Sequence, residues 1–166
     1  MSDYIQSLLV QYRTKGILID TNLLLLYFVG SYDPQRIEKF KRTIIFTVED
    51  FQRLVKLINY FETVVTTPNV LTEVSNLSNQ LPQQVKDLYF QVFGQLTLNL
   101  QETYQPSEEI CALPHFRRFG LTDSGIIDLA PEKYLVLTDD FPLANYLQSA
   151  NVDVINFNHI RTLNWR

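Results

Sequence analysis

Apolar residues follow two different spacings along this chain. Four short runs, at 16–20, 63–66, 134–138 and 152–155, are rich in apolar and β-branched residues, as strands buried in a parallel sheet are. The segments between them repeat apolar residues every three or four positions, which is the spacing of helices. Strands that alternate with helices predict parallel strands joined by right-handed crossovers. We therefore expect a helix-rich α/β fold, a three-layer sandwich with a short, mainly parallel central sheet and helices on both faces.

Helix ends are marked by proline, glycine and capping residues. Thr47 and Asp50 have the spacing of a capping box, and Pro68 suits the first turn of a helix. Gly30 is expected to close the helix that follows the first strand. The expected helices cover 3–12, 21–29, 47–61, 68–79, 82–99, a segment that starts near 107, 123–130 and 141–149. With no linker and no internal repeat, the 166 residues are expected to form one domain, 1–166.

Four acidic residues stand at the junctions between strands and helices or on the apolar stripe of a helix. They are Asp20, Glu73, Asp123 and Asp140, called here the four acids. Glu73 falls in a helical series with the apolar residues Val70, Val74 and Leu77, and the other three acids head similar series. Open α/β sheets build their sites where strands end. Because several carboxylates directed at one place are costly without a positive partner, the pattern predicts core-facing acids around a divalent cation.

Each acid also has a purely structural interpretation. Asp20, Asp123 and Asp140 have the residue type and position of helix N-caps, each of which stabilises a helix by about 1 kcal/mol. Glu73 lies inside its helix, so its alternative is a buried ion pair with a lysine or an arginine. An N-cap aspartate can also bind a metal, so the structural and the functional interpretations are compatible.

The segments around the four acids resemble the motifs of a known family. The motifs are Ile-Asp-Thr-Asn at 19–22, Pro-Asn-Val-Leu-Thr-Glu-Val at 68–74, Leu-Thr-Asp-Ser at 121–124 and Leu-Thr-Asp-Asp at 137–140. In order and context they resemble the four acidic motifs of PIN-domain nucleases, over residues 16–157. The resemblance implies a PIN-like fold and makes the four acids the catalytic metal ligands. It also implies that Asn22 and Thr138 are groups that support these ligands.

The fourth motif contains two adjacent aspartates. The family pattern is Thr-x-Asp, which selects Asp140 as the ligand. Asp139 stays open between three roles: a group outside the ligand set, a solvated turn acid, and a further metal ligand.

The ligand chemistry favours a hard cation. An all-oxygen set of carboxylates suits Mg²⁺ or Mn²⁺ rather than zinc. A zinc site would need several cysteine or histidine ligands together, and the sequence has one cysteine, Cys111, and two well-separated histidines, His115 and His159.

The family resemblance implies a hydrolase, an endoribonuclease that cleaves RNA phosphodiester bonds and leaves a 5′-phosphate and a 3′-hydroxyl. Family members include the toxins of toxin–antitoxin pairs and RNA-processing enzymes, so an antitoxin partner is left open, as is a homodimer. Two other functions stay open: a DNA-acting nuclease with the same acids, and a non-catalytic PIN-like module that binds RNA or protein. An aspartyl-phosphate hydrolase is disfavoured, because the position two residues after Asp20 is Asn22.

Net charge changes the expectation for substrate binding. The chain carries a formal charge of −4, so bulk attraction to a nucleic acid is absent and any contact with phosphate must be local. One local candidate is Arg117 with Arg118, next to His115 and Phe116, since arginine and aromatic groups together suit phosphate contact and base stacking. A second candidate is the group Lys39, Lys41 and Arg42. Either group is also explained as a solvated cationic surface.

A membrane location is not expected. The apolar stretch 17–29 contains Asp20 and Asn22 and is too short to span a bilayer. The start of the chain lacks the cationic segment and apolar run of a secretory leader. The single cysteine fits a reducing compartment, so we expect a cytoplasmic protein.

Overall fold

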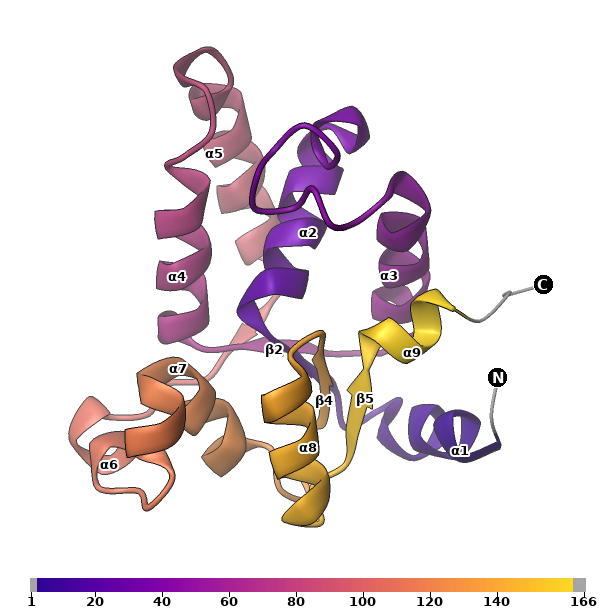
Figure 1. Ribbon diagram of the computed structural model, residues 1–166, viewed down its shortest axis with the longest axis vertical. Helices are drawn as coiled ribbons and strands as arrows, with labels where there is room; N and C mark the ends of the chain where they lie inside the picture. The colour runs from indigo at the N-terminus through magenta and orange to yellow at the C-terminus, as the bar shows by residue number, and fades with distance from the viewer. Residues whose placement is uncertain (1–2, 163–166) are drawn as a thin grey trace.

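A parallel sheet forms the centre of the computed structural model, which describes residues 3–162 (Figure 1). Within these residues the sheet has five strands in the order β3-β2-β1-β4-β5, and every pair of neighbours is parallel. The strands are β1 (Ile17–Ile19), β2 (Val64–Thr66), β3 (Gln101–Glu102), β4 (Leu135–Thr138) and β5 (Val154–Asn156). The predicted α/β class, the parallel sheet and the high helix content are confirmed.

Helices connect the strands and cover the sheet. They are α1 (Asp3–Tyr12), α2 (Thr21–Tyr32), α3 (Val48–Tyr60), α4 (Pro68–Ser78), α5 (Gln83–Thr97), α6 (Ser107–Cys111), α7 (Phe116–Leu129), α8 (Phe141–Ser149), α9 (Phe157–Arg161) and a 3₁₀ turn, η1 (Pro34–Arg36). The chain moves from β1 to β3 in one direction and from β4 to β5 in the other, so right-handed crossovers put helices on both faces. In Figure 1, α2 to α5 lie in the upper half and α6 to α8 in the lower half.

The order in which strands are added to the sheet reverses between β1 and β4. These two strands pair in register, with Ile19 opposite Leu137, and the backbone N–H of Asp20 donates to the carbonyl of Leu137 at 3.1 Å. Connections leave β1 and β4 toward opposite sides of the sheet, which opens a crevice beyond their carboxyl ends. The residues that follow these two strands therefore lie at the place where doubly wound sheets bind ligands.

The core lies around β1, β4 and helix α2. All residues of β1 and β4 are buried. Helix α2 is apolar on nearly every side, because it packs against α3, α4 and α5 as well as the sheet. Parallel strands covered on both faces show this continuous apolar pattern rather than alternation.

Helix starts follow the predicted capping signals. Thr47 caps α3 in a full capping box: its hydroxyl accepts from the backbone N–H of Asp50, and the Asp50 carboxylate accepts from the backbone N–H of Thr47. Pro68 occupies the first turn of α4, and Thr67 caps that helix through the N–H of Val70. The predictions for the starts of these two helices are confirmed.

The prediction that Gly30 ends the second helix is wrong. Helix α2 continues through Gly30 to Tyr32 and is capped by Asp33. Gly30 faces the ring of Phe51 on α3 so closely that a Cβ there would overlap the ring. The glycine therefore serves close packing between α2 and α3, not termination.

Three further elements differ from the sequence prediction. The edge strand β3 and the short helix α9 were not predicted. Helix α7 begins at Phe116, before the predicted start at Asp123, and is broken by Gly120 at φ +73° and ψ −172°. This left-handed region favours glycine, so the helix is two segments, the second of which opens just before Asp123.

In the portion of the chain that the structure describes, none of the helices has both the length and the apolar character needed to cross a membrane.

Candidate functional site

All four acids line one hollow at the carboxyl edge of the sheet. This acidic hollow has a volume of about 160 Å³, and its lining residues are Asp20, Thr21, Asn22, Glu73, Leu77, Asp123 and Asp140. The carboxylates come from separate parts of the chain: Asp20 follows β1, Glu73 lies on α4, Asp123 on α7 and Asp140 before α8. The fold thus gathers residues up to 120 positions apart at the sheet's change of direction.

Asp20 is the buried member of the group, with 4% of its surface exposed. Its Oδ1 accepts from the backbone N–H of Leu23 at 3.0 Å, so it is also the N-cap of α2. Its Oδ2 accepts from the hydroxyl of Thr138 and from the backbone N–H of Asp139 at 3.2 Å. Burial raises the pKa of Asp20 well above its ordinary value, and the negative charge of Asp139 raises it further.

Glu73 differs from its predicted environment. The apolar stripe of α4 predicted a core-facing acid, but the Glu73 side chain is exposed, while its neighbours Val70 and Val74 are buried. Glu73 is exposed because it borders the acidic hollow, where no neighbouring element that the structure describes packs over its side chain. No lysine or arginine of the described residues forms an ion pair with Glu73. Instead its Oε2 accepts from the Thr21 hydroxyl at 2.9 Å and its Oε1 from the Thr122 hydroxyl at 2.6 Å.

Asp123 is half-buried, and no described residue donates a hydrogen bond to its carboxylate. Burial raises its pKa to about 6, and the charges of Asp140 and Glu73 act in the same direction. Two other acids of the hollow therefore lie close enough to Asp123 to disfavour its charge. Its carboxylate is free to accept a cation.

Asp140 is exposed and caps α8. Its Oδ1 accepts from the backbone N–H of Leu143 at 2.8 Å, and its own N–H donates to the Thr138 hydroxyl at 3.0 Å. Thr138 thus contacts both Asp20 and the backbone of Asp140. Asp20 and Asp140 are therefore helix N-caps, as the structural interpretation predicted, and they also line the acidic hollow.

Asp139 does not line the acidic hollow. It is half-buried, and its Oδ1 accepts from the Asn22 side chain at 3.3 Å. The side chain of Asn158 donates to its backbone carbonyl at 2.8 Å. Asn22, which was predicted to support the metal ligands, therefore contacts Asp139, while Thr138 contacts Asp20 directly.

The donor set fits a divalent cation of the Mg²⁺ type. All its charged groups are carboxylates, and two hydroxyls and the amide of Asn22 stand beside them. Among residues 3–162, no group of three or more His, Cys, Asp or Glu side chains is already arranged to hold an ion. Repulsion among uncompensated carboxylates favours such a spread arrangement, and after burial the charges of Asp140 and Glu73 are what raises the pKa of Asp123.

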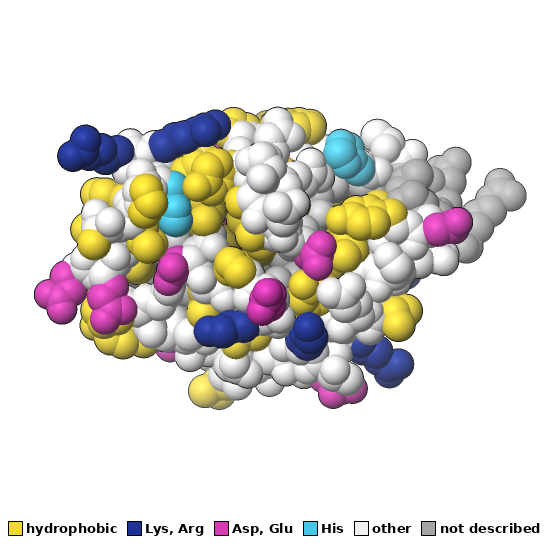
Figure 2. Space-filling model, turned by 90° about the horizontal axis from the view of Figure 1, so that it is seen from below, with side chains coloured by type: hydrophobic (Ala, Val, Ile, Leu, Met, Phe, Trp, Pro, Cys, Tyr) yellow, Lys and Arg dark blue, Asp and Glu magenta, His cyan; other side chains and the backbone are white. Residues whose placement is uncertain are grey.

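The predicted substrate-binding arginines lie on the first segment of α7. Arg117 and Arg118 are both exposed. The guanidinium of Arg118 lies over the rings of Phe119, at 4.8 Å from the centroid, and Tyr146, at 5.7 Å. Tyr146 also lies 5.9 Å from the ring of His115. Figure 2 views the molecule from the side of α7 and α8 and shows basic, histidine and apolar side chains together on that face.

Tyr146 and Phe119 were missed by the sequence prediction. The contact between α7 and α8 that brings them to Arg118 was not predictable from spacing alone. The other basic group, Lys39, Lys41 and Arg42, is exposed, and Arg42 donates to the side chain of Gln80 at 2.9 Å.

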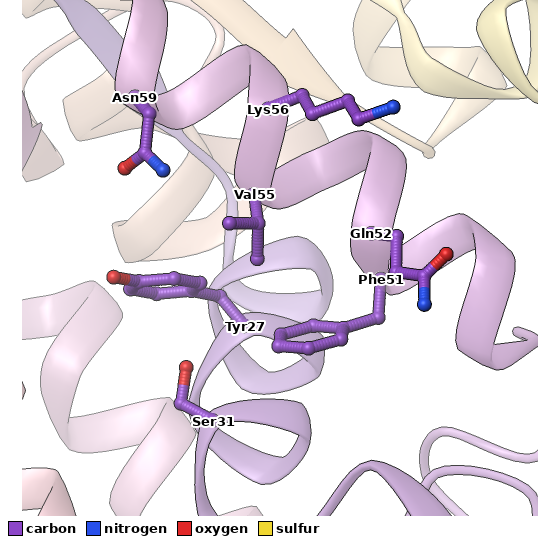
Figure 3. Close-up of a pocket in the computed structure, with 7 residues that line it drawn as sticks. All are labelled: Tyr27, Ser31, Phe51, Gln52, Val55, Lys56 and Asn59. Carbon is purple, nitrogen blue, oxygen red and sulfur yellow. The ribbon is translucent and has the colours of Figure 1, made fainter.

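A larger hollow of about 540 Å³ lies between α2 and α3 (Figure 3). Its lining residues are Tyr27, Ser31, Phe51, Gln52, Val55, Lys56 and Asn59. It contains no carboxylate, and Lys56 is its only charged side chain. The hollow between α2 and α3 is the larger of the two, but only the acidic hollow has clustered carboxylates. These carboxylates favour the smaller acidic hollow as the functional site.

Comparisons of the chain with protein-family models, with curated proteins and with solved structures find no match.

Proposed function

We propose that this protein is a metal-dependent nuclease that hydrolyses RNA at the acidic hollow. The observation that carries the proposal is the gathering of all four acids, from four separate segments, around one hollow at the carboxyl edge of the sheet. Carboxylates placed in this way are unfavourable for the fold: burial raises the pKa of Asp20 and of Asp123, and the charges of Asp140 and Glu73 raise that of Asp123 further. A function that needs clustered negative charge explains why the chain keeps them.

The four acids would hold one or two Mg²⁺ or Mn²⁺ ions. When bound, such an ion lowers the pKa of water and neutralises charge that develops on a phosphate. The chain itself holds the ligands in place. Asp20 is fixed by three donors, from Leu23, Thr138 and Asp139, so its carboxylate is oriented before any ion arrives. Asp139, which contacts Asn22 outside the hollow, would act on Asp20 through its charge.

RNA would be held by the first segment of α7. Arg117 and Arg118 are exposed, and Arg118 is stacked on two aromatic rings, which fixes the direction of its guanidinium. Gly120 separates this basic segment from Asp123 by a few residues, so phosphate contacts and the acidic hollow lie on consecutive parts of one helix. This local positive charge would offset the net charge of −4.

A non-catalytic module that binds RNA or protein is the second candidate. The observation that favours it is that, within residues 3–162, no group of three or more His, Cys, Asp or Glu side chains is already arranged to hold an ion. A nuclease acting on DNA would use the same acids. A role as the toxin of a toxin–antitoxin pair, a homodimer and a cytoplasmic location are further parts of the proposal, supported by the family resemblance and the composition.

The test is cleavage of a single-stranded RNA by the purified protein with Mn²⁺ or Mg²⁺. We expect cleavage that EDTA abolishes and that Asp20→Asn and Glu73→Gln each reduce by about 100-fold or more. Asp87→Asn, which removes an exposed acid on α5, is the matched control and should keep full activity. Cleavage that survives in both site variants would overturn the proposal. Cleavage of DNA alone would favour the DNA-acting nuclease. Ion binding without cleavage of either nucleic acid would favour the non-catalytic binding module.

The arginines are tested by binding rather than by cleavage. Replacing Arg117 and Arg118 together by alanine should weaken RNA binding and reduce its salt dependence, by about one unit of slope for each lost phosphate contact. Replacing Lys39 and Lys41 in the same way should leave both unchanged. Equal losses in the two pairs would indicate nonspecific attraction.

A further inference from the structure

Glu73 is oriented by two hydroxyl groups from different helices. The hydroxyl of Thr122 donates to Oε1 at 2.6 Å and that of Thr21 donates to Oε2 at 2.9 Å. Thr21 opens α2, Glu73 lies on α4 and Thr122 opens the second segment of α7. The carboxylate therefore has one donor on each oxygen, and the donors come from both sides of the hollow.

This pair of contacts orients Glu73 as three hydrogen-bond donors orient Asp20. Glu73 is exposed, has no ion pair within the described residues, and has a flexible side chain that would otherwise sample several rotamers. A hydroxyl uses one lone pair of a carboxylate oxygen and leaves the others to accept a cation. Hydroxyl donors can thus aim the carboxylate without neutralising it, which a lysine or an arginine would do.

Thr122 is the more strongly constrained of the two donors. Its side chain is 7% exposed, whereas that of Thr21 is half-buried. Threonine is stiff at χ1, and burial of the residue fixes the hydroxyl further. Gly120, at φ +73°, sets the direction of the helix segment that carries both Thr122 and Asp123. One backbone segment therefore delivers a proposed ligand, Asp123, and the donor that orients another ligand, Glu73.

We propose that Thr122 is a positioning residue for Glu73 in the cation site, with Thr21 as the second donor. This inference rests on the proposed metal site. Groups that orient metal ligands typically contribute about 10-fold to 100-fold in metal affinity or activity. Thr122 is a neighbour of Asp123, but its role acts through the Glu73 carboxylate, and that is what distinguishes it from a residue that merely packs.

The first measurement is Mn²⁺ binding by calorimetry, without any substrate. Thr122→Val keeps the shape and removes the hydroxyl, so we expect its Mn²⁺ affinity to fall by about 10-fold to 100-fold. Thr122→Ser keeps the donor and should restore most of the affinity. Thr43→Val is the matched control, since it removes another buried hydroxyl, which donates to the carbonyl of Ile37, away from the hollow. It should lower thermal stability without lowering Mn²⁺ affinity.

The second measurement is a double-variant cycle with Glu73→Gln. If Thr122 acts through Glu73, adding Thr122→Val to Glu73→Gln should cause no further loss of Mn²⁺ affinity. Additive losses would overturn the positioning role, as would an unchanged affinity in Thr122→Val. Wild-type protein that binds no Mn²⁺ would overturn the metal site and this inference together, whereas wild-type binding with an unaffected Thr122→Val overturns the inference alone.

Discussion

The hydroxyl of Thr138 donates a hydrogen bond to the carboxylate of Asp20, although 118 positions separate the two residues in the chain. Thr138 is the last residue of β4 and Asp20 follows β1, so the bond joins the carboxyl ends of neighbouring parallel strands. Both residues are buried. The same bond lowers the pKa of Asp20 against the larger effect of burial. It is therefore a structural link and an electrostatic one.

Removing this link should destabilise the fold. In Thr138→Val the buried Asp20 carboxylate loses a donor, and we expect the free energy of unfolding in urea to fall by about 1–3 kcal/mol. Thr66→Val is a matched control, because Thr66 ends strand β2, on the other side of β1, and its buried hydroxyl has no hydrogen-bond partner among the described residues. That variant should be neutral or slightly stabilising. Equal losses in both variants would mean that volume, not the hydrogen bond, matters.

Divalent ions should stabilise the native protein. An ion that binds only the folded state at 100 times its Kd adds about 2.7 kcal/mol, and in a chain of this size each kcal/mol raises Tm by about 2–4 °C. Melting curves with Mn²⁺ and with EDTA measure this shift. Asp20→Asn should abolish the shift and, because it removes a disfavoured buried charge, should melt higher than wild type in EDTA. Asp87→Asn should behave as wild type, and a shift retained in Asp20→Asn would speak against an ion at this hollow.

The stability of the ion-free protein should fall as pH rises through the acidic range. The pKa of Asp123 is raised from 3.8 to about 6. Below the lower value both states are protonated, and between the two values the unfolded chain loses its proton first, which favours unfolding. Asp123 alone should cost roughly 1–3 kcal/mol across this window. Urea unfolding in EDTA at several pH values should give a shallower decline for Asp123→Asn than for wild type; parallel curves would contradict the raised pKa.

Close packing at Gly30 should tolerate no side chain. Gly30→Ala places a methyl group against the ring of Phe51, and overpacking of this kind costs about 1–3 kcal/mol. Gly94→Ala on α5 is the control, because a Cβ there meets open space. That change should stabilise the protein by up to about 1 kcal/mol. Thermal melting compares the two, and a tolerated Gly30→Ala would indicate that α3 can move away from α2.

The parts of the fold that the sequence predicted are those with local signals. Asp20 directly follows an apolar strand and Asp140 is the second residue after one, and each caps the helix that follows, so their position at the sheet edge could be inferred from the chain alone. The exposure of Glu73 could not be inferred in this way. Helical spacing gives the direction of a side chain, but it does not show whether other side chains pack against it. Strand β3 has no apolar residue and is held by its backbone bonds to β2, so it carries no pattern to detect.

Contacts between helices that are distant in the sequence could not be predicted either. The stacking of Arg118 on Tyr146 depends on how α7 packs against α8, and the hydrogen bond from Thr122 to Glu73 depends on how α7 meets α4. Thr122 stands in the motif around Asp123, but nothing in the motif indicates which distant carboxylate its hydroxyl reaches.

The insertion of β4 beside β1 has a consequence for the order of folding. In a chain that folds from its N-terminus during synthesis, β1 can pair with β2 on one side, but its other edge stays open until the residues after position 134 arrive. Until then Asp20, Glu73 and Asp123 have no Asp140 beside them. In such a chain the fourth carboxylate of the hollow arrives together with the central strand pairing of the sheet, when most of the core is available to hold the four acids together.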